Sequence, residues 1–247
     1  MRVLLLGGTT EASALAVRLA QARIDTVFSY AGRTRAPVLQ PLPTRIGGFG
    51  GVQGLMNYLK SKAISHVIDA THPFAAGMSV NAFAACTQIG TALIRLERAP
   101  WVAQVGDNWT IVDQIENMPK ALPDAPARVF LAIGKQQIGL FSVKPQHHYV
   151  LRLVDAPDAP LPLPQTTVVL ARGPFTTHED TALMRDNGIT HVLAKNAGGS
   201  AARAKLNAAR ALRLPVIMAA RPALPGAALD SVDAVMGWLG HSALRGV

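Results

Sequence analysis

Two glycines followed by two threonines stand where a first β-strand is predicted to end and a helix to begin. The stretch consists of Gly7, Gly8, Thr9, Thr10 and Glu11. Glycines let a backbone turn tightly and approach a pyrophosphate, and a helix start offers free N–H groups and a partial positive charge. Either threonine can cap the helix and also bind a phosphate. The third glycine of the dinucleotide fingerprint is absent, so the motif alone is a weak signal. Its position directly after the first strand nevertheless favours phosphate or dinucleotide binding over a simple turn.

Arginines follow the second predicted strand, where NAD-binding folds carry an acid. Such an acid lies about 20 residues after the glycines and binds the ribose 2′-hydroxyl. This chain has Ser29, Gly32, Arg33 and Arg35 there, and no acid. A guanidinium binds a 2′-phosphate through paired hydrogen bonds. We therefore predict NADPH as the cofactor, the alternative being two ordinary solvated arginines.

A polar and aromatic loop follows a buried strand predicted at residues 66–70. The loop positions are Ala70, Thr71, His72, Pro73 and Phe74. In the usual topology this strand lies beside the first one, so its loop would reach the nicotinamide half of the cofactor. His72 is the candidate catalytic residue, as a proton donor or an orienting group, although we expect a binding role first. Glu11 suits the helix dipole and is a candidate for a ribose hydroxyl.

Cations and glycines recur at predicted strand ends in the second half of the chain. They are Lys135, Arg172, Lys195, Asn196, Gly198, Gly199 and Arg221. Several cations around one crevice would form an anion-binding wall, so we predict that these residues bind the substrate. The alternative for each one alone is a turn glycine with a solvated charge.

Short apolar runs alternate with alanine-rich helical patterns along the chain, which predicts βαβ units and parallel sheets. A proline-punctuated stretch at 122–126 is typical of a linker. We expect an α/β fold with two Rossmann-like parallel-sheet domains facing a shared cleft. Residues 1–122 would bind NADPH, and residues 127–247 would close over the substrate. Ligands would bind beyond the carboxyl ends of the strands.

Composition excludes several classes of protein. Among 247 residues, Cys86 is the single cysteine, so we expect no disulfide within the chain and no metal site. No apolar run approaches the ~18 residues of a membrane span, and the first one is too short for a signal peptide. We therefore expect a cytoplasmic protein without membrane contact. The sequence leaves the oligomeric state open, and a monomer is compatible with it.

The net charge of +9 favours an anionic partner. The basic residues are scattered and aromatic residues make up 5% of the chain, so we expect no nucleic acid partner. A phosphorylated cofactor or a polycarboxylate substrate suits this pattern better.

Five stretches together resemble the precorrin-6A reductase family over nearly the whole chain. They are Gly7-Gly8-Thr9-Thr10-Glu11-Ala12, Tyr30-Ala31-Gly32-Arg33, Gly47-Gly48-Phe49-Gly50-Gly51, Asp69-Ala70-Thr71-His72-Pro73-Phe74-Ala75 and Lys195-Asn196-Ala197-Gly198-Gly199. The third and fourth stretches are the most specific. Ala197 departs from the serine that is common in the last one.

The resemblance implies an NADPH-dependent oxidoreductase of cobalamin biosynthesis. It would reduce one C=C bond of a tetrapyrrole, precorrin-6A or cobalt-precorrin-6A, by hydride transfer with a proton added next to it. The many carboxylates of this macrocycle would suit the cationic strand ends. Two alternatives stay open: a nucleotide-sugar enzyme with two Rossmann-like halves, and a non-catalytic NADPH-sensing module.

Overall fold

The computed structural model describes residues 1–32, 36–200 and 202–244, and it divides into two compact units. The first unit comprises Met1–Ala99 and Ala223–Val247, and the second comprises Pro100–Pro222. Each unit contains one sheet of six parallel strands with helices. The predicted α/β, Rossmann-like class is therefore confirmed for both units.

The sheet of the first unit has the strand order β12-β5-β4-β1-β2-β3. Its strands are β1 (Arg2–Leu6), β2 (Asp25–Tyr30), β3 (Thr44–Ile46), β4 (His66–Asp69), β5 (Ala92–Leu96) and β12 (Ala228–Leu229). Its helices are α1 (Thr10–Gln21), α2 (Gly51–Ser61), α3 (Ala76–Ile89) and α7 (Val232–Leu244). The strand order reverses between β1 and β4, and this switch point is where ligands bind in open α/β sheets.

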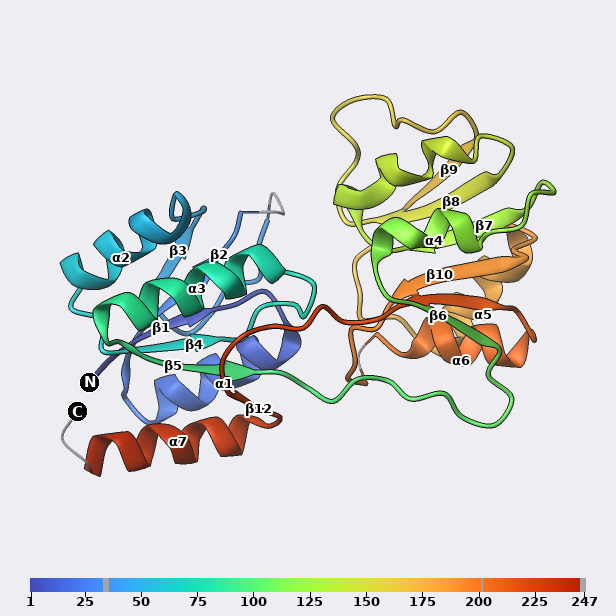
Figure 1. The fold of residues 1–247 in the computed structure, drawn as a ribbon. Coiled ribbons are helices and arrows are strands. Elements are labelled where there is room, and N and C mark those ends of the chain that lie inside the picture. Colours follow the sequence, from blue (N-terminus) through green and yellow to red (C-terminus); the bar gives the residue numbers. More distant parts are fainter. Residues whose placement is uncertain (33–35, 201, 245–247) are drawn as a thin grey trace. The chain divides into compact units, whose positions relative to one another are not determined.

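Both faces of the first sheet are covered, which explains why β1 is a continuous apolar run. Val3 and Leu5 pack into a cluster with α1 and α7, whereas Leu4 and Leu6 pack into a second cluster with α2 and α3. Figure 1 shows the red C-terminal helix α7 beside the blue helix α1. The C-terminal helix α7 thus forms part of the same hydrophobic core as the N-terminal strand β1.

The sheet of the second unit has the order β6-β11-β10-β7-β8-β9. Its strands are β6 (Trp109–Val112), β7 (Arg128–Ala132), β8 (His148–Leu153), β9 (Thr166–Leu170), β10 (His191–Lys195) and β11 (Val216–Ala219). Its α-helices are α4 (Met118–Ala121), α5 (Thr177–Asp186) and α6 (Ala204–Ala211), and its 3₁₀ helices are η1 (Ile115–Asn117) and η2 (Lys135–Val143). Here the order reverses between β7 and β10.

Two strands join the sheet other than the one formed by the five strands before them in the chain. β6 follows β5 along the chain but pairs with β11, and β12 follows β11 but pairs with β5. The units therefore differ from the predicted division into 1–122 and 127–247. The predicted linker at 122–126 only connects α4 to β7 within the second unit. Hydrophobic periodicity identifies a strand but does not say which sheet it joins.

Gly7 offers a test of the packing behind the first loop. A Cβ on Gly7 would lie 2.1 Å from Cζ of Phe28, whose ring is fully buried. Overpacking of this kind costs about 1–3 kcal/mol, so Gly7→Ala should lower the free energy of unfolding by about that amount.

The matched control is Gly48→Ala, because no atom lies within 4 Å of a Cβ at Gly48. Urea denaturation of both variants measures the difference. Equal free energies of unfolding for Gly7→Ala and the unsubstituted chain would contradict the packing described here.

Candidate functional site

The glycine loop lies at the carboxyl end of β1, next to the switch point. The Gly7 N–H donates to the Ser29 carbonyl of β2 over 2.9 Å, which fixes the path of the loop against the neighbouring strand. Gly8 has a φ of 124°, and no atom lies within 4 Å of the position that a Cβ would occupy there. This backbone is open to a phosphate in a way that a side chain would prevent.

Thr9 connects the glycine loop to the end of β4. Its hydroxyl donates to the Ala70 carbonyl over 2.8 Å and accepts from the Ala12 N–H over 3.1 Å, so Thr9 also caps α1. A threonine hydroxyl has a single proton to donate, and here that proton is engaged. A phosphate at this loop would therefore be bound by backbone N–H groups, and not by a proton from the Thr9 side chain.

Glu11 is compensated by a distant arginine. Its carboxylate accepts from the Thr10 hydroxyl over 3.0 Å and forms an ion pair with Arg98, which follows β5. The ion pair offsets the negative charge beside the loop, so the N-terminus of α1 keeps its favourable potential for an anion. Sequence reasoning missed Arg98 because the two partners are 87 residues apart and meet only through the sheet order.

Beside the end of β2, strand β3 carries a cation that the sequence analysis did not select as a candidate. Arg33 and Arg35, the predicted 2′-phosphate ligands, lie outside the described residues. Arg45 of β3 pairs in register with Ser29 of β2, and its guanidinium donates to the Ser29 hydroxyl over 2.8 Å. Gly32 follows β2 with a φ of 75°. The signal that could have indicated Arg45 is its place just before the glycine-rich run at 47–51.

The loop after β4 is held by Asp69. This buried carboxylate accepts from the Thr71 N–H over 3.1 Å and from the Thr71 hydroxyl over 2.7 Å. The Phe74 N–H donates to Nδ1 of His72 over 3.2 Å. Because Nδ1 accepts this hydrogen bond, the neutral form of the His72 ring has its proton on Nε2.

A small cavity of about 10 Å³ lies at the carboxyl ends of β4 and β5, which is room for about one water molecule. It is lined by Asp69, Thr71, His72, Pro73, Ser79, Arg95, Leu96, Glu97 and Leu224. Arg95 donates to the carbonyls of Leu224 and Pro225 over 2.7 and 3.0 Å, and it pairs with Glu97. Arg95 thereby fixes the segment that leads into β12.

Lys195 ends β10, beside the switch point of the second sheet. Its Nζ donates over 2.9 Å to Oε1 of Gln137, which belongs to η2 after β7. This hydrogen bond therefore crosses the switch point. Burial lowers the pKa of Lys195 to about 8, so the amine is protonated at neutral pH but gives up its proton more readily than an exposed lysine.

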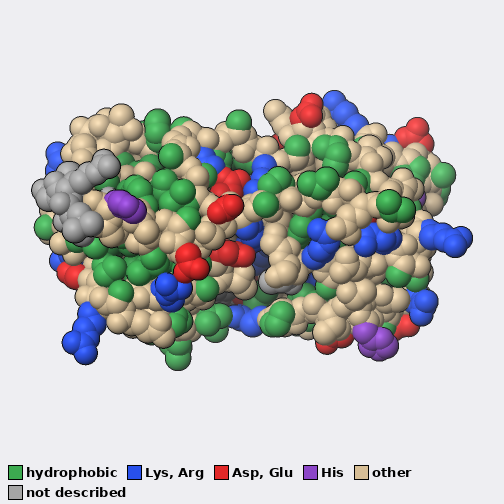
Figure 2. Space-filling model, turned by 90° about the horizontal axis from the view of Figure 1, so that it is seen from below, with side chains coloured by type: hydrophobic (Ala, Val, Ile, Leu, Met, Phe, Trp, Pro, Cys, Tyr) green, Lys and Arg blue, Asp and Glu red, His purple; other side chains and the backbone are tan. Residues whose placement is uncertain are grey.

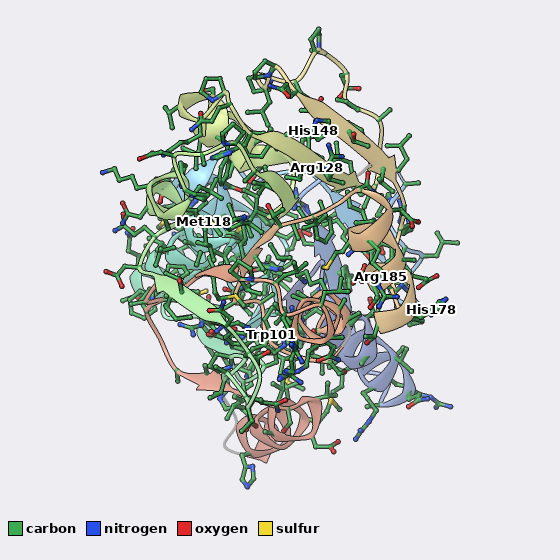
Figure 3. The ribbon with its side chains drawn as sticks, turned by 90° about the vertical axis from the view of Figure 1, so that its right-hand side faces the viewer. Trp101, Met118, Arg128, His148, His178 and Arg185 are labelled. Carbon is green, nitrogen blue, oxygen red and sulfur yellow. The ribbon has the colours of Figure 1, made fainter. Side chains whose placement is uncertain are left out.

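Asn196 and Arg221, predicted to bind the substrate, bind the protein's own backbone. The Asn196 amide accepts from the Trp101 N–H over 2.7 Å and donates to the Trp101 carbonyl over 2.9 Å. Trp101, labelled in Figure 3, packs in the core of the second unit and donates to the Gly199 carbonyl over 2.6 Å. Arg221 donates to the carbonyls of Asn196 and Ala197 over 2.8 and 2.9 Å. These contacts shape the loop that follows Lys195.

The other predicted residues of the second unit are spread along one edge of the sheet. Gly198 and Gly199 adopt left-handed φ values of 68° and 73°. Lys135, after β7, forms an exposed ion pair with Asp158 at 2.9 Å. Arg172 is exposed and follows β9 at the margin of the sheet. The structure therefore brings Lys135 and Lys195 to adjacent strands and places Arg172 two strands away from Lys135.

Among the described residues, no group of three or more His, Cys, Asp or Glu side chains could hold a metal ion. None of the described helices combines the length and the apolar character that crossing a membrane requires. Figure 2 shows lysine and arginine side chains at separate places on one face, interspersed with acidic and apolar ones.

Comparison with known proteins identifies the family to which this chain is similar. A family model described as "Precorrin-6x reductase CbiJ/CobK" matches residues 2–240. A precorrin-6A reductase of Rhodobacter capsulatus is 63% identical over 249 residues, which cover 100% of this chain and 99% of that relative. A cobalt-precorrin-6A reductase of Priestia megaterium is 30% identical over 232 residues, covering 89% of this chain and 90% of that relative.

A solved structure agrees with these sequence relatives. The structure described as "CobK precorrin-6A reductase" superimposes with a TM-score of 0.95 at 63% sequence identity. The match covers 98% of this chain and 96% of the other. The fold, with one parallel sheet in each of two units, is therefore shared with that structure.

Lys195 offers a test of the second switch point. Because burial lowers its pKa to about 8, from an ordinary value of 10.5, one lysine resonance of a ¹⁵N-lysine-labelled chain should titrate near pH 8. Lys195→Met should remove this resonance. The unfolded chain holds that proton more tightly than the folded chain, so the native protein should gain stability relative to Lys195→Met as the pH rises from about 8 toward 10.5. Lysine signals that all titrate above pH 10 would refute the burial of this amine.

Proposed function

Because the chain belongs to the precorrin-6x reductase family, we propose that it uses NADPH to reduce one double bond of precorrin-6A in cobalamin biosynthesis. The observation that carries this proposal is the open glycine loop at the first switch point, within a chain that matches the family along its length. The relatives named for precorrin-6A are 41–63% identical, and those named for cobalt-precorrin-6A are 26–30% identical. This difference favours the metal-free macrocycle as substrate.

The residues at the end of β1 fit a dinucleotide. Gly7 and Gly8 leave the backbone open, and the start of α1 offers N–H groups and a partial positive charge to a pyrophosphate. Thr9 and Thr10 would contribute their backbone N–H groups, because their hydroxyl protons are donated within the protein. Arg98 compensates Glu11, which removes the main electrostatic objection to a phosphate at this loop.

The 2′-phosphate would lie at the end of β2, where the chain lacks the acid of an NAD-binding fold. Gly32 allows the turn there, and we propose Arg33 as the phosphate ligand with Arg35 as a helper. Two guanidinium groups on one short segment would offer the paired donors that a phosphate prefers.

The loop after β4 would bind the reactive end of the cofactor. When bound, NADPH would supply the hydride for the double bond. Ala70, Thr71, Pro73 and Phe74 would shape the pocket around that end, because Asp69 and Thr9 hold the loop beside the glycine loop. His72, with its proton on Nε2, would orient the substrate or donate the proton that the second carbon needs.

The cations of the second unit suit a polycarboxylate macrocycle. Lys195, protonated at neutral pH, would pair with one carboxylate, and Lys135 and Arg172, which follow β7 and β9, would pair with others. Asn196, Gly198, Gly199 and Arg221 would act by shaping the loop after Lys195. Positioning two large ligands is the main task left to a protein whose cofactor carries out the chemistry.

Anaerobic oxidation of NADPH, followed by its absorbance, tests the proposed reaction. We expect turnover with enzymatically prepared precorrin-6A and slower turnover with the cobalt form, because the more similar relatives are named for the metal-free substrate. Faster turnover with the cobalt form would reverse the choice of substrate. Saturable NADPH binding without turnover of either macrocycle would refute the proposed reaction.

Arg33→Ala tests the choice of cofactor. Loss of a charge-assisted hydrogen bond removes about 1.5–3 kcal/mol, so the KM for NADPH should rise by about 10- to 100-fold. The KM for NADH should change little, because NADH lacks the 2′-phosphate. An equal loss for both cofactors would show that Arg33 does not bind the 2′-phosphate.

A further inference from the structure

Arg45 is held firmly at the carboxyl end of β3. Its Nη1 donates to the Ser29 hydroxyl over 2.8 Å and to the Gly47 carbonyl over 2.9 Å, and its Nη2 donates to the Gly48 carbonyl over 3.1 Å. Its Cζ lies 3.8 Å from the centre of the Phe49 ring, so one face of the guanidinium is covered. An arginine with this many partners has one orientation, which is the condition for a precise ligand contact.

The partners that Arg45 has among the described residues are all neutral. Within the described residues, no carboxylate forms an ion pair with Arg45, whereas Arg18, Arg95 and Arg98 each have one. A partly buried charge of this kind is usually paired, because desolvation without a counter-charge is costly. The missing negative charge at this place points to an anionic ligand.

The donors that remain on Arg45 suit a phosphate. A guanidinium has five N–H groups, and the three hydrogen bonds use both of Nη1 and one of Nη2. No hydrogen bond to a described residue uses the Nε–H or the second N–H of Nη2. Two such neighbouring donors form the fork that binds phosphate oxygens in pairs.

The surroundings of Arg45 also favour an anion. The Gly47–Gly51 run leads from β3 into α2, and α2 has no acidic residue in its first turn. The Gly50 N-cap contributes no side chain, and no atom lies within 4 Å of a Cβ at Gly48 or Gly50. The potential of the helix start therefore adds to that of Arg45.

We propose that Arg45 and the Ser29 hydroxyl form part of a site for a phosphate monoester, the 2′-phosphate of the cofactor's adenosine ribose. The argument for this ligand is position: Ser29 stands near the end of the second strand, where dinucleotide-binding folds contact the ribose 2′ position. The inference rests on NADPH as the cofactor and adds a ligand from β3 to those expected after β2.

Binding to fragments of the cofactor tests this role without any tetrapyrrole. Calorimetry of the full chain would compare 2′,5′-ADP with 5′-AMP, which differ only in the 2′-phosphate. The variants are Arg45→Met, which removes the donors, and Arg45→Lys, which keeps the charge. The matched control is Arg18→Met, because Arg18 pairs with Asp233 on the surface of α1 and α7.

We expect Arg45→Met to weaken 2′,5′-ADP binding by about 10- to 100-fold and to leave 5′-AMP binding within about threefold. Arg45→Lys should recover part of the affinity, and Arg18→Met should match the unsubstituted chain. Equal losses for both nucleotides would show that Arg45 only clamps the 47–51 loop and would overturn the proposal, as would unchanged binding of both. An unsubstituted chain that bound the two nucleotides equally would refute NADPH as cofactor, a failure distinct from that of Arg45.

Discussion

The candidate cofactor site of the first unit depends on the two hydrogen bonds of the Thr9 hydroxyl. By donating to Ala70 and capping α1 through Ala12, this hydroxyl fixes the glycine loop, the helix start and the loop after β4 relative to one another. A phosphate and a reactive ring bound to those two loops would thus keep a constant separation. The second sheet has a comparable bond at its own switch point, between Lys195 and Gln137. In both sheets, therefore, a hydrogen bond joins the ends of the two strands between which the strand order reverses.

Local features of this chain could be read from the sequence, and contacts between distant segments could not. The apolar run of β1 and the glycines after it predicted a strand, a loop and a helix start where the structure has them. Arg98 and Arg45 were missed because their partners, Glu11 and Ser29, are set by the order of strands in a sheet. The division into units differed for the same reason, since alternating strands and helices do not reveal where β6 and β12 pair.

The basic character of the chain is a poor guide to its anion-binding surface. Several of the cations that contribute to the net charge of +9 bind the protein's own carbonyls. Arg95 holds Leu224 and Pro225, and Arg221 holds Asn196 and Ala197. An arginine can satisfy several carbonyls at once because its donors are arranged in a rigid fork. Whether a cation at a strand end can bind an anionic ligand therefore depends less on its position than on the partners that its donors already have.

The pairing of β12 with β5, and of β6 with β11, determines the order in which the two units can be completed during synthesis. The second unit is continuous in sequence, whereas the first needs β12 and α7 from the final residues. The segment that leaves the ribosome first therefore waits for the segment that leaves last, with the apolar face that α7 covers still exposed. A nascent chain that stalls before residue 223 contains all of the second unit and an unfinished first one. The earliest-made half of the molecule is thus the one that most needs protection by chaperones before release.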